Sequence, residues 1–241
     1  GSIGGKEACL RLRPNSDLEE VELMLQQTTD ASDLCTRKGN PVFADVTDVS
    51  ASLERADLGG SLQPKELLRI AGILRCARTI KSYVAEDEKE TVLDALFKAL
   101  TPNKYLEDKI FGAILSEEEI ADNASAALAD IRRHMRIQAG KIRDSLQKVI
   151  SSPAYAKYLR EPIITIRQGR YVVPVKSENK NDVPGLVHDV SATGSTYFIE
   201  PISAVNANNA LRELDLKEKK EIERILAELS AEAAAHREDI N

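Results

Sequence analysis

Tryptophan is absent from this 241-residue chain, and aromatic residues make up only 4% of it. No apolar run approaches the roughly 20 residues that a membrane span requires, and no signal peptide is recognisable. Charged residues instead reach 30%, and alanine, leucine, glutamate, lysine and arginine dominate, as is typical of long amphipathic helices. The composition therefore predicts a mainly α-helical cytoplasmic protein that does not contact a membrane.

The sequence also contains few of the residues and motifs that catalysis or metal binding requires. Its three cysteines are widely spaced and form no C-x-x-C pair, which argues against a disulfide framework or a zinc site. Zinc-protease and phosphate-loop motifs are missing. The stretch from 185 to 201 gathers His188, Asp189, Ser191 and Ser195, but strand alternation would send His188 and Asp189 to opposite faces. We therefore expect no catalytic residue, no metal site and no cofactor in this chain.

Helical periodicity covers about the first 115 residues. Apolar spacing predicts helices over 15–38, 46–58, 64–84 and 88–100, followed by a short piece over 104–110. Ser16 and Glu19 have the spacing of a capping box, and Pro64 fits the first turn of a helix. These segments predict a helical core bundle over residues 1–115.

Two longer helical patterns follow. Residues 116–119 read S-E-E-E, a second capping box, and no proline interrupts the chain until Pro153. Apolar residues near a 3.5-residue repeat predict one helix over 116–150 and a matching one over 202–241. Because both apolar stripes are narrow, they favour an antiparallel coiled coil, which would act as a lever arm.

The segment between these helices, residues 151–201, is expected to form a small β tip. Clusters of β-branched and aromatic residues flank Gln168-Gly169, which predicts a hairpin with a two-residue turn. Two further strands are predicted over 185–190 and 196–199, with a turn over 191–195.

Positive charge is concentrated in one part of the chain. The net charge is −6, yet residues 131–180 contain twelve lysines and arginines against three acidic residues. Such segregation predicts a surface that faces a polyanion, with a solvated basic helix face as the alternative interpretation. The candidate nucleic-acid-binding residues at the tip are Arg167, Arg170, Lys176 and Lys180, and those along the arm are Arg132, Arg133, Arg136, Lys141 and Arg143.

One long stretch resembles a known family. It includes IRQGRYVVPVK, VPGLVHDVSATGSTYFIEP and NNALREL, and weaker similarity reaches back through LRLRPNSDLEEV and ERADLGGSLQPKELLRIA. These motifs are similar to those of bacterial MutS-related proteins of the second type, which are MutS paralogues with a C-terminal Smr nuclease domain. The resemblance implies a helical core, lever helices and a clamp-like tip. It also implies a homodimeric parent protein that uses ATP and Mg²⁺, with ATPase and nuclease domains outside this non-enzymatic fragment.

Three functions are compatible with these observations. The first is clamping of branched or recombining DNA through its phosphate backbone, which would suppress recombination. The second, also implied by the resemblance, is clamping of stalled or collided ribosomes for rescue, with ribosomal RNA as the partner. The third is a structural coiled-coil adaptor whose basic face binds an acidic protein.

Overall fold

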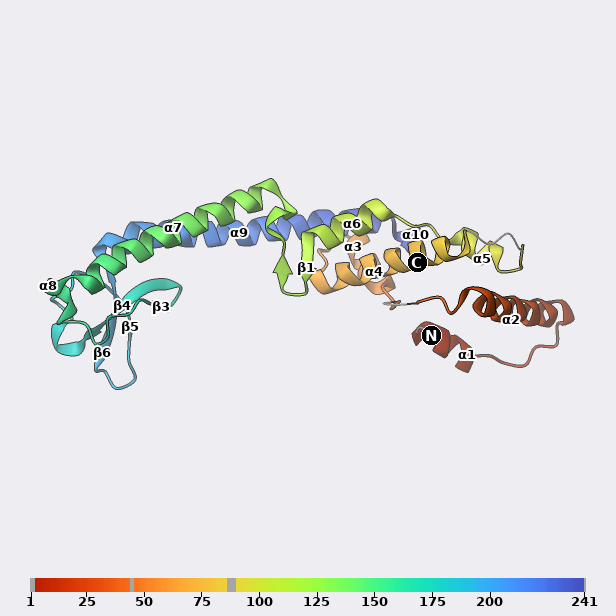
Figure 1. Cartoon of the computed structure of the whole chain (residues 1–241), viewed down its shortest axis with the longest axis horizontal. Helices are drawn as coiled ribbons and strands as arrows, with labels where there is room; N and C mark the ends of the chain where they lie inside the picture. Colours follow the sequence, from red (N-terminus) through yellow and green to blue (C-terminus); the bar gives the residue numbers. More distant parts are fainter. Residues whose placement is uncertain (1–2, 44–45, 86–89, 241) are drawn as a thin grey trace. The chain divides into compact units, whose positions relative to one another are not determined.

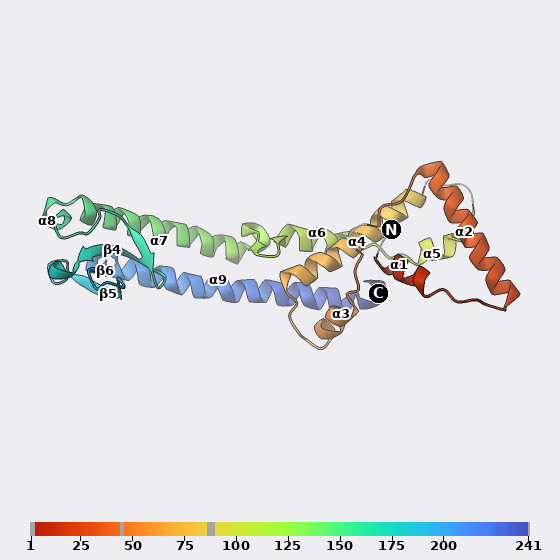
Figure 2. The same cartoon turned by 90° about the horizontal axis from the view of Figure 1, so that it is seen from below.

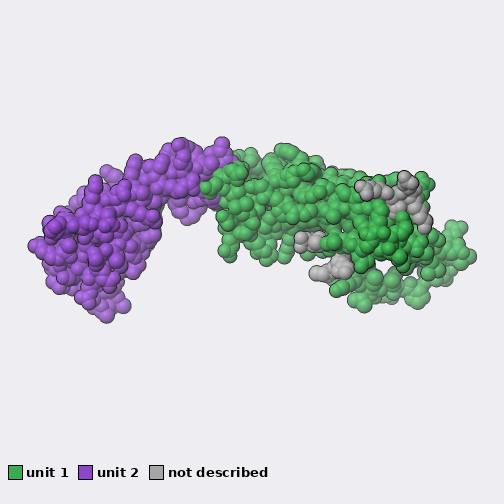
Figure 3. Space-filling view, in the orientation of Figure 1, with its two compact units in different colours: residues 1–124, 223–241 green, residues 125–222 purple. Residues whose placement is uncertain are grey.

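The computed structural model describes residues 3–43, 46–85 and 90–240 and confirms a mainly α-helical chain with small antiparallel sheets (Figure 1). The chain divides into two compact units (Figure 3). Unit 1 consists of residues 1–124 and 223–241, and unit 2 consists of residues 125–222. None of the described helices combines the length and the apolar character that crossing a bilayer requires.

Unit 1 is built from short and medium helices. They are α1 (Ile3–Leu10), α2 (Leu18–Lys38), α3 (Ser50–Asp57), α4 (Pro64–Val84), α5 (Asp94–Ala99), α6 (Lys104–Ala113) and α10 (Arg237–Ile240). The sequence did not predict α1. Helix α2 begins later than predicted, because the Asp17 side chain, rather than Ser16, accepts hydrogen bonds from the amides of Glu19 and Glu20. Helix α3 begins at Ser50 rather than at residue 46, and residues 88 and 89 of the predicted fourth helix lie outside the described residues.

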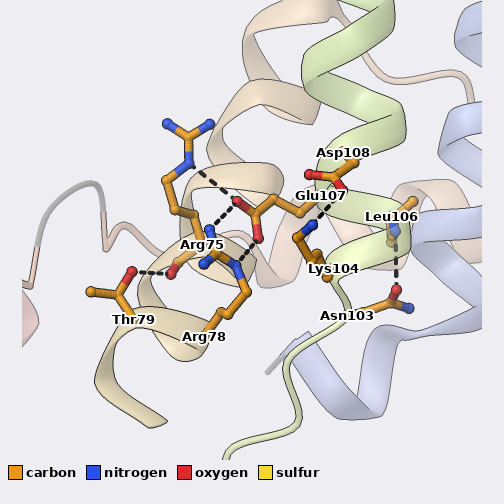
Figure 4. Close-up of polar contacts among 8 residues, drawn as sticks. All are labelled: Arg75, Arg78, Thr79, Asn103, Lys104, Leu106, Glu107 and Asp108. Carbon is orange, nitrogen blue, oxygen red and sulfur yellow. Dashed lines mark hydrogen bonds and ion pairs between the residues drawn. The ribbon is translucent and has the colours of Figure 1, made fainter. Parts of the chain in front are cut away.

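The core of unit 1 lies between α4 and α6, where Leu67, Ile70, Leu106 and Ile110 are almost fully buried. Buried Glu107 of α6 also joins the two helices (Figure 4). Its carboxylate accepts hydrogen bonds from Arg78 Nε at 2.8 Å and from Arg75 Nε at 3.3 Å. The Arg78 hydrogen bond lowers the pKa of Glu107 and outweighs the opposing effect of burial.

A second carboxylate with a lowered pKa lies at the start of α4. Glu66 forms a capping box that was not predicted for this helix, in which its side chain accepts from the backbone N–H of Gln63 at 3.0 Å. Ser52 and Arg55 also donate to Glu66. Burial acts to raise the pKa of Glu66, but these hydrogen bonds prevail and lower it to about 2.

The helix predicted over 116–150 begins ten residues later than expected. Strand β1 (Ile114–Ser116) pairs with β2 (Glu119–Ile120), a 3₁₀ turn covers Asp122–Ala124, and α7 runs over Ala126–Ser151. The prediction of a helix start at Ser116 is therefore wrong. Ile114 and Ile120 are both buried, and Ser125, whose side chain accepts from the amide of Leu128 at 2.9 Å, caps the helix.

Within unit 2, α7 lies beside the first part of α9 (Ile202–Ala235), as Figure 2 shows. Polar contacts between described residues join the helices in antiparallel order. They include Ser125 to Glu221 at 2.7 Å, Arg132 to Glu218 at 2.6 Å and Ser145 to Ser203 at 3.0 Å. The interlocked side-chain geometry of a coiled coil stays a prediction.

The sheet of unit 2 connects these helices. After α8 (Pro153–Ala156), it contains β3 (Thr165–Arg167), β4 (Arg170–Lys176), β5 (Gly185–Val190) and β6 (Thr196–Pro201), all antiparallel in the order β3-β4-β6-β5. The predicted turn is confirmed, because Gln168 and Gly169 both have positive φ, at 50° and 74°. Val173, Val175 and Ile199 pack with Ile142 and Leu146 of α7 in one buried cluster, which holds the sheet against the helix.

Candidate nucleic-acid interface

Unit 2 has an excess of positive charge. Residues 125–222 contain sixteen lysines and arginines against eleven aspartates and glutamates. A cation can bind a ligand only if its contacts inside the unit leave it accessible. These contacts differ among the nine candidate residues.

The Arg170 side chain is largely buried and contacts the sheet of unit 2. Its side chain is 14% exposed and donates from Nη1 to Glu200 at 3.0 Å, while the Glu200 side chain is fully buried. His188 Nε2 lies against the other oxygen of the same carboxylate. Because the charge of Arg170 offsets that of a buried glutamate, this arginine helps to hold the sheet together, and its contact with phosphate stays a prediction.

Arg167, on the other side of the turn, is more accessible but also engaged. Its Nε lies 3.4 Å from Asp189 Oδ2, and its guanidinium lies 4.2 Å from the centroid of the Phe198 ring. Nη1 donates to the carbonyl oxygen of Ile166 at 2.9 Å. With 39% of its side chain exposed, Arg167 can reach a ligand only by exchanging some of these contacts.

The ammonium groups of the two candidate lysines at the tip contact neutral groups, and Lys176 also interacts electrostatically with Glu178. Lys176 Nζ donates to the carbonyl oxygen of Lys157 at 2.9 Å. Lys180 is exposed, and its Nζ lies 5.4 Å from the centroid of the Tyr197 ring. Neither contact cancels a charge, so both lysines still contribute to a positive potential at the surface.

The candidates on α7 fall into two groups. Arg132 pairs with Glu218, and Arg133 pairs with Asp130 one turn earlier. The hydrogen bond from Arg133 lowers the pKa of Asp130. Arg136, Lys141 and Arg143 are exposed, and Lys141 and Arg143 flank fully buried Ile142 in the sequence. Helical geometry therefore directs these two cations away from the core.

Sequence reasoning missed several exposed cations in unit 2. Lys148, Lys157 and Arg160 belong to the basic stretch, and they could have been nominated from it. Arg212 could not, because it lies on α9, some thirty residues beyond that stretch, in a segment where acidic residues are equally frequent.

The side chains of His188, Ser191 and Ser195 contact other residues and not one another. His188 contacts Glu200, whereas the Ser191 side chain accepts from the amide of Thr196 at 3.1 Å and the Ser195 hydroxyl lies 2.8 Å from that of Thr193. These serine contacts are those of a turn. Within the part of the chain that the structure describes, no group of three His, Cys, Asp or Glu side chains could hold a metal ion.

A cleft of about 550 Å³ lies within unit 2, and we name it the hairpin cleft. It is enclosed by α7, by the β3–β4 hairpin and by α9. Ala139, Ile166, Tyr171 and Leu211 contribute to its apolar lining, and Arg136 and Arg212 contribute positive charge.

Comparison with known proteins gives a consistent set of relatives. The chain is 48% identical over 233 residues to a protein named Endonuclease MutS2 from Ruminiclostridium cellulolyticum, and 46% identical over 232 residues to one of the same name from Acetivibrio thermocellus. In both cases the match covers 95% of this chain and 29% of the relative. No protein-family profile matches the chain. The chain is therefore similar to a segment, under a third of the length, of proteins named MutS2.

Proposed function

We propose that this chain is a non-catalytic, nucleic-acid-binding part of a MutS-like protein and that unit 2 contacts the phosphate backbone without reading base sequence. The supporting observation is the surplus of positive charge in unit 2, with exposed cations such as Lys141 and Arg143 on α7. Phosphates attract such side chains regardless of sequence, and counterion release supplies much of the binding free energy.

Branched DNA is the ligand that we propose first, because the relatives are named endonucleases, a class of enzymes that act on nucleic acids. ATP and Mg²⁺ binding, nuclease activity and homodimer formation are proposed only for a complete MutS2-like protein. Ribosomal RNA presents the same phosphate chemistry, so stalled or collided ribosomes are the alternative ligand, and an acidic partner protein is the alternative from another class.

The first experiment compares these ligands directly. Fluorescence anisotropy would measure binding of the chain to a four-way DNA junction and to a linear duplex, and co-sedimentation would measure binding to ribosomes, at several salt concentrations between about 50 and 200 mM, a range set by the expected salt response. We expect tighter binding to the junction and a steep loss of affinity with salt. Preference for ribosomes would favour the alternative ligand, and affinity that does not change with salt would contradict backbone binding.

A charge-reversal pair tests the surface on α7. Lys141→Glu together with Arg143→Glu should weaken junction binding and reduce the slope of log K against log salt by about two, roughly one for each phosphate that is no longer neutralised. The matched control is Arg13→Glu with Lys98→Glu, two exposed cations of unit 1 that give the same change in net charge. If both pairs weaken binding equally, only the net charge matters, and the assignment to α7 is wrong.

A further inference from the structure

The hairpin cleft has the size and the chemistry of a ligand site rather than of a packing defect. Its volume of about 550 Å³ lies within the range of small-molecule and cofactor sites. Ile166 is 52% exposed although it is an apolar residue on a short strand, and it forms part of the lining. An apolar surface of this kind that remains accessible to water gains free energy when a flat apolar group covers it.

The charged residues of the cleft select for an anion. Arg136 and Arg212 both line it, against a single carboxylate, that of Asp215. Asp215 Oδ2 already accepts a hydrogen bond from Lys219 Nζ at 2.9 Å, so a further cation lies beside that carboxylate. The cleft therefore combines an apolar lining with a net positive charge.

We propose that the hairpin cleft binds one unpaired nucleotide, with its base against the lining formed by Ala139, Ile166 and Leu211 and its phosphate beside Arg136 and Arg212. This inference rests on the proposed function and adds a ligand class to it. A base pair within a duplex cannot enter, since each of its bases is stacked on both faces, whereas a bulged or flap nucleotide presents a free face. Tyr171 and the Gln168–Gly169 turn complete the enclosure.

The test uses a DNA duplex with a single bulged 2-aminopurine, whose fluorescence reports on the surroundings of that base. We expect the chain to bind the bulged duplex about tenfold more tightly than the fully paired duplex, as estimated from the free energy of burying part of one base against aliphatic side chains. The fluorescence of the bulged base should change on binding, and the fluorescence of 2-aminopurine placed within the paired duplex should stay constant.

Two variants locate the effect. Ala139→Phe should fill the cleft and abolish the preference for the bulge while leaving duplex affinity unchanged. Arg212→Glu, at an exposed position, should reduce the preference without altering the fold. Ala127→Phe is the matched control, because Ala127 is an exposed alanine of the same helix that does not line the cleft. Circular dichroism would verify that each variant retains its helical content.

The outcomes separate this inference from the proposed function. Equal affinity for bulged and paired duplexes, or a preference that survives Ala139→Phe, would overturn the nucleotide site and leave backbone binding intact. Loss of all duplex binding at low salt would instead contradict the proposed function. The site would then stand only if adenosine 5′-monophosphate shifts the NMR signals of Ala139 and Ile166 and not those of Ala127.

Discussion

Asn208 of α9 completes the hydrogen bonding of the sheet, and its substitution gives a sharp test of the fold of unit 2. The side chain is almost fully buried, its Oδ1 accepts from the amide of Tyr171 and its Nδ2 donates to the carbonyl oxygen of Tyr171, both at 3.2 Å. The β4–β6 register pairs Val173 with Ile199, so Pro201 would stand opposite Tyr171. Proline has no N–H to donate, and the Asn208 amide therefore takes the place of the missing strand partner.

Asn208→Ala should lower the free energy of unfolding of unit 2 by about 2–3 kcal/mol. Two hydrogen bonds are removed, each with a net contribution of about 1 kcal/mol, and a half-buried N–H and C=O are left without their partner. The amide of Tyr171 should exchange with solvent roughly 30- to 140-fold faster, since every 1.4 kcal/mol corresponds to a factor of about ten. Hydrogen exchange followed by NMR measures this directly.

Two controls make the result specific. Asn209→Ala changes the exposed neighbouring residue and should alter stability by less than about 0.5 kcal/mol. Asn208→Asp keeps the shape and the acceptor, but at neutral pH it buries a carboxylate whose second oxygen faces the carbonyl oxygen of Tyr171, so it should destabilise unit 2 at least as much as Asn208→Ala does. Unchanged exchange of that amide in Asn208→Ala would refute the role of Asn208 as a strand substitute.

Three further predictions concern stability. Gly185→Ala should destabilise unit 2 by more than about 2 kcal/mol in thermal melts, because a Cβ at residue 185 would lie 2.2 Å from the carbonyl oxygen of Glu200. A Cβ at residue 140 would meet nothing within 4 Å, so Gly140→Ala should stabilise α7 by about 0.5–1 kcal/mol. Since the pKa of Glu66 is lowered from its ordinary 4.5 to about 2, its stabilisation is complete above pH 4.5 and is lost as the pH falls toward 2; Glu66→Gln should flatten this loss in urea titrations. The lowered pKa of Glu107 has the same sign, so Glu107→Gln should cost about 1–3 kcal/mol at neutral pH and progressively less below pH 4.5.

The sequence predicted the hairpins of unit 2 well because their signals are local. A two-residue Gln168-Gly169 turn between β-branched runs determines its own register, and the structure has Arg167 opposite Arg170, as such a turn requires. Strand β5 has the predicted limits, and β6 extends two residues further, to Pro201.

The start of α7 could not be located in the same way. The S-E-E-E motif at 116–119 has the spacing of a capping box, and Ile120 fits the helical stripe as well as it fits a strand, whereas the helix is capped by Ser125. The choice is made by tertiary packing, since β1 contacts α4 and α6, and Ile114 and Ile120 are buried in a strand pair that a continuous helix would not form.

The same distinction applies to the candidate interface. Exposure of Lys141 and Arg143 follows from helical periodicity, because both are adjacent to buried Ile142. The burial of Arg170 does not follow from periodicity. Its partner Glu200 lies thirty residues away on another strand, and the motif that contains Arg170 does not indicate this pairing.

The ion pairs of unit 2 also set an upper limit on how strongly salt can act on binding. At least four of the nine candidate cations pair with carboxylates, among them Arg132, Arg133, Arg167 and Arg170. A paired cation releases few counterions, because a phosphate that approaches it must displace an anion already in place. No more than five of the nine can therefore contribute fully, which limits their share of the slope of log K against log salt to about 4.5 instead of about 8. A charge count made from sequence alone overestimates the attraction for this reason: it counts each arginine as if it were exposed to solvent, while the fold uses some of them to bury the carboxylates of its own sheet and helices.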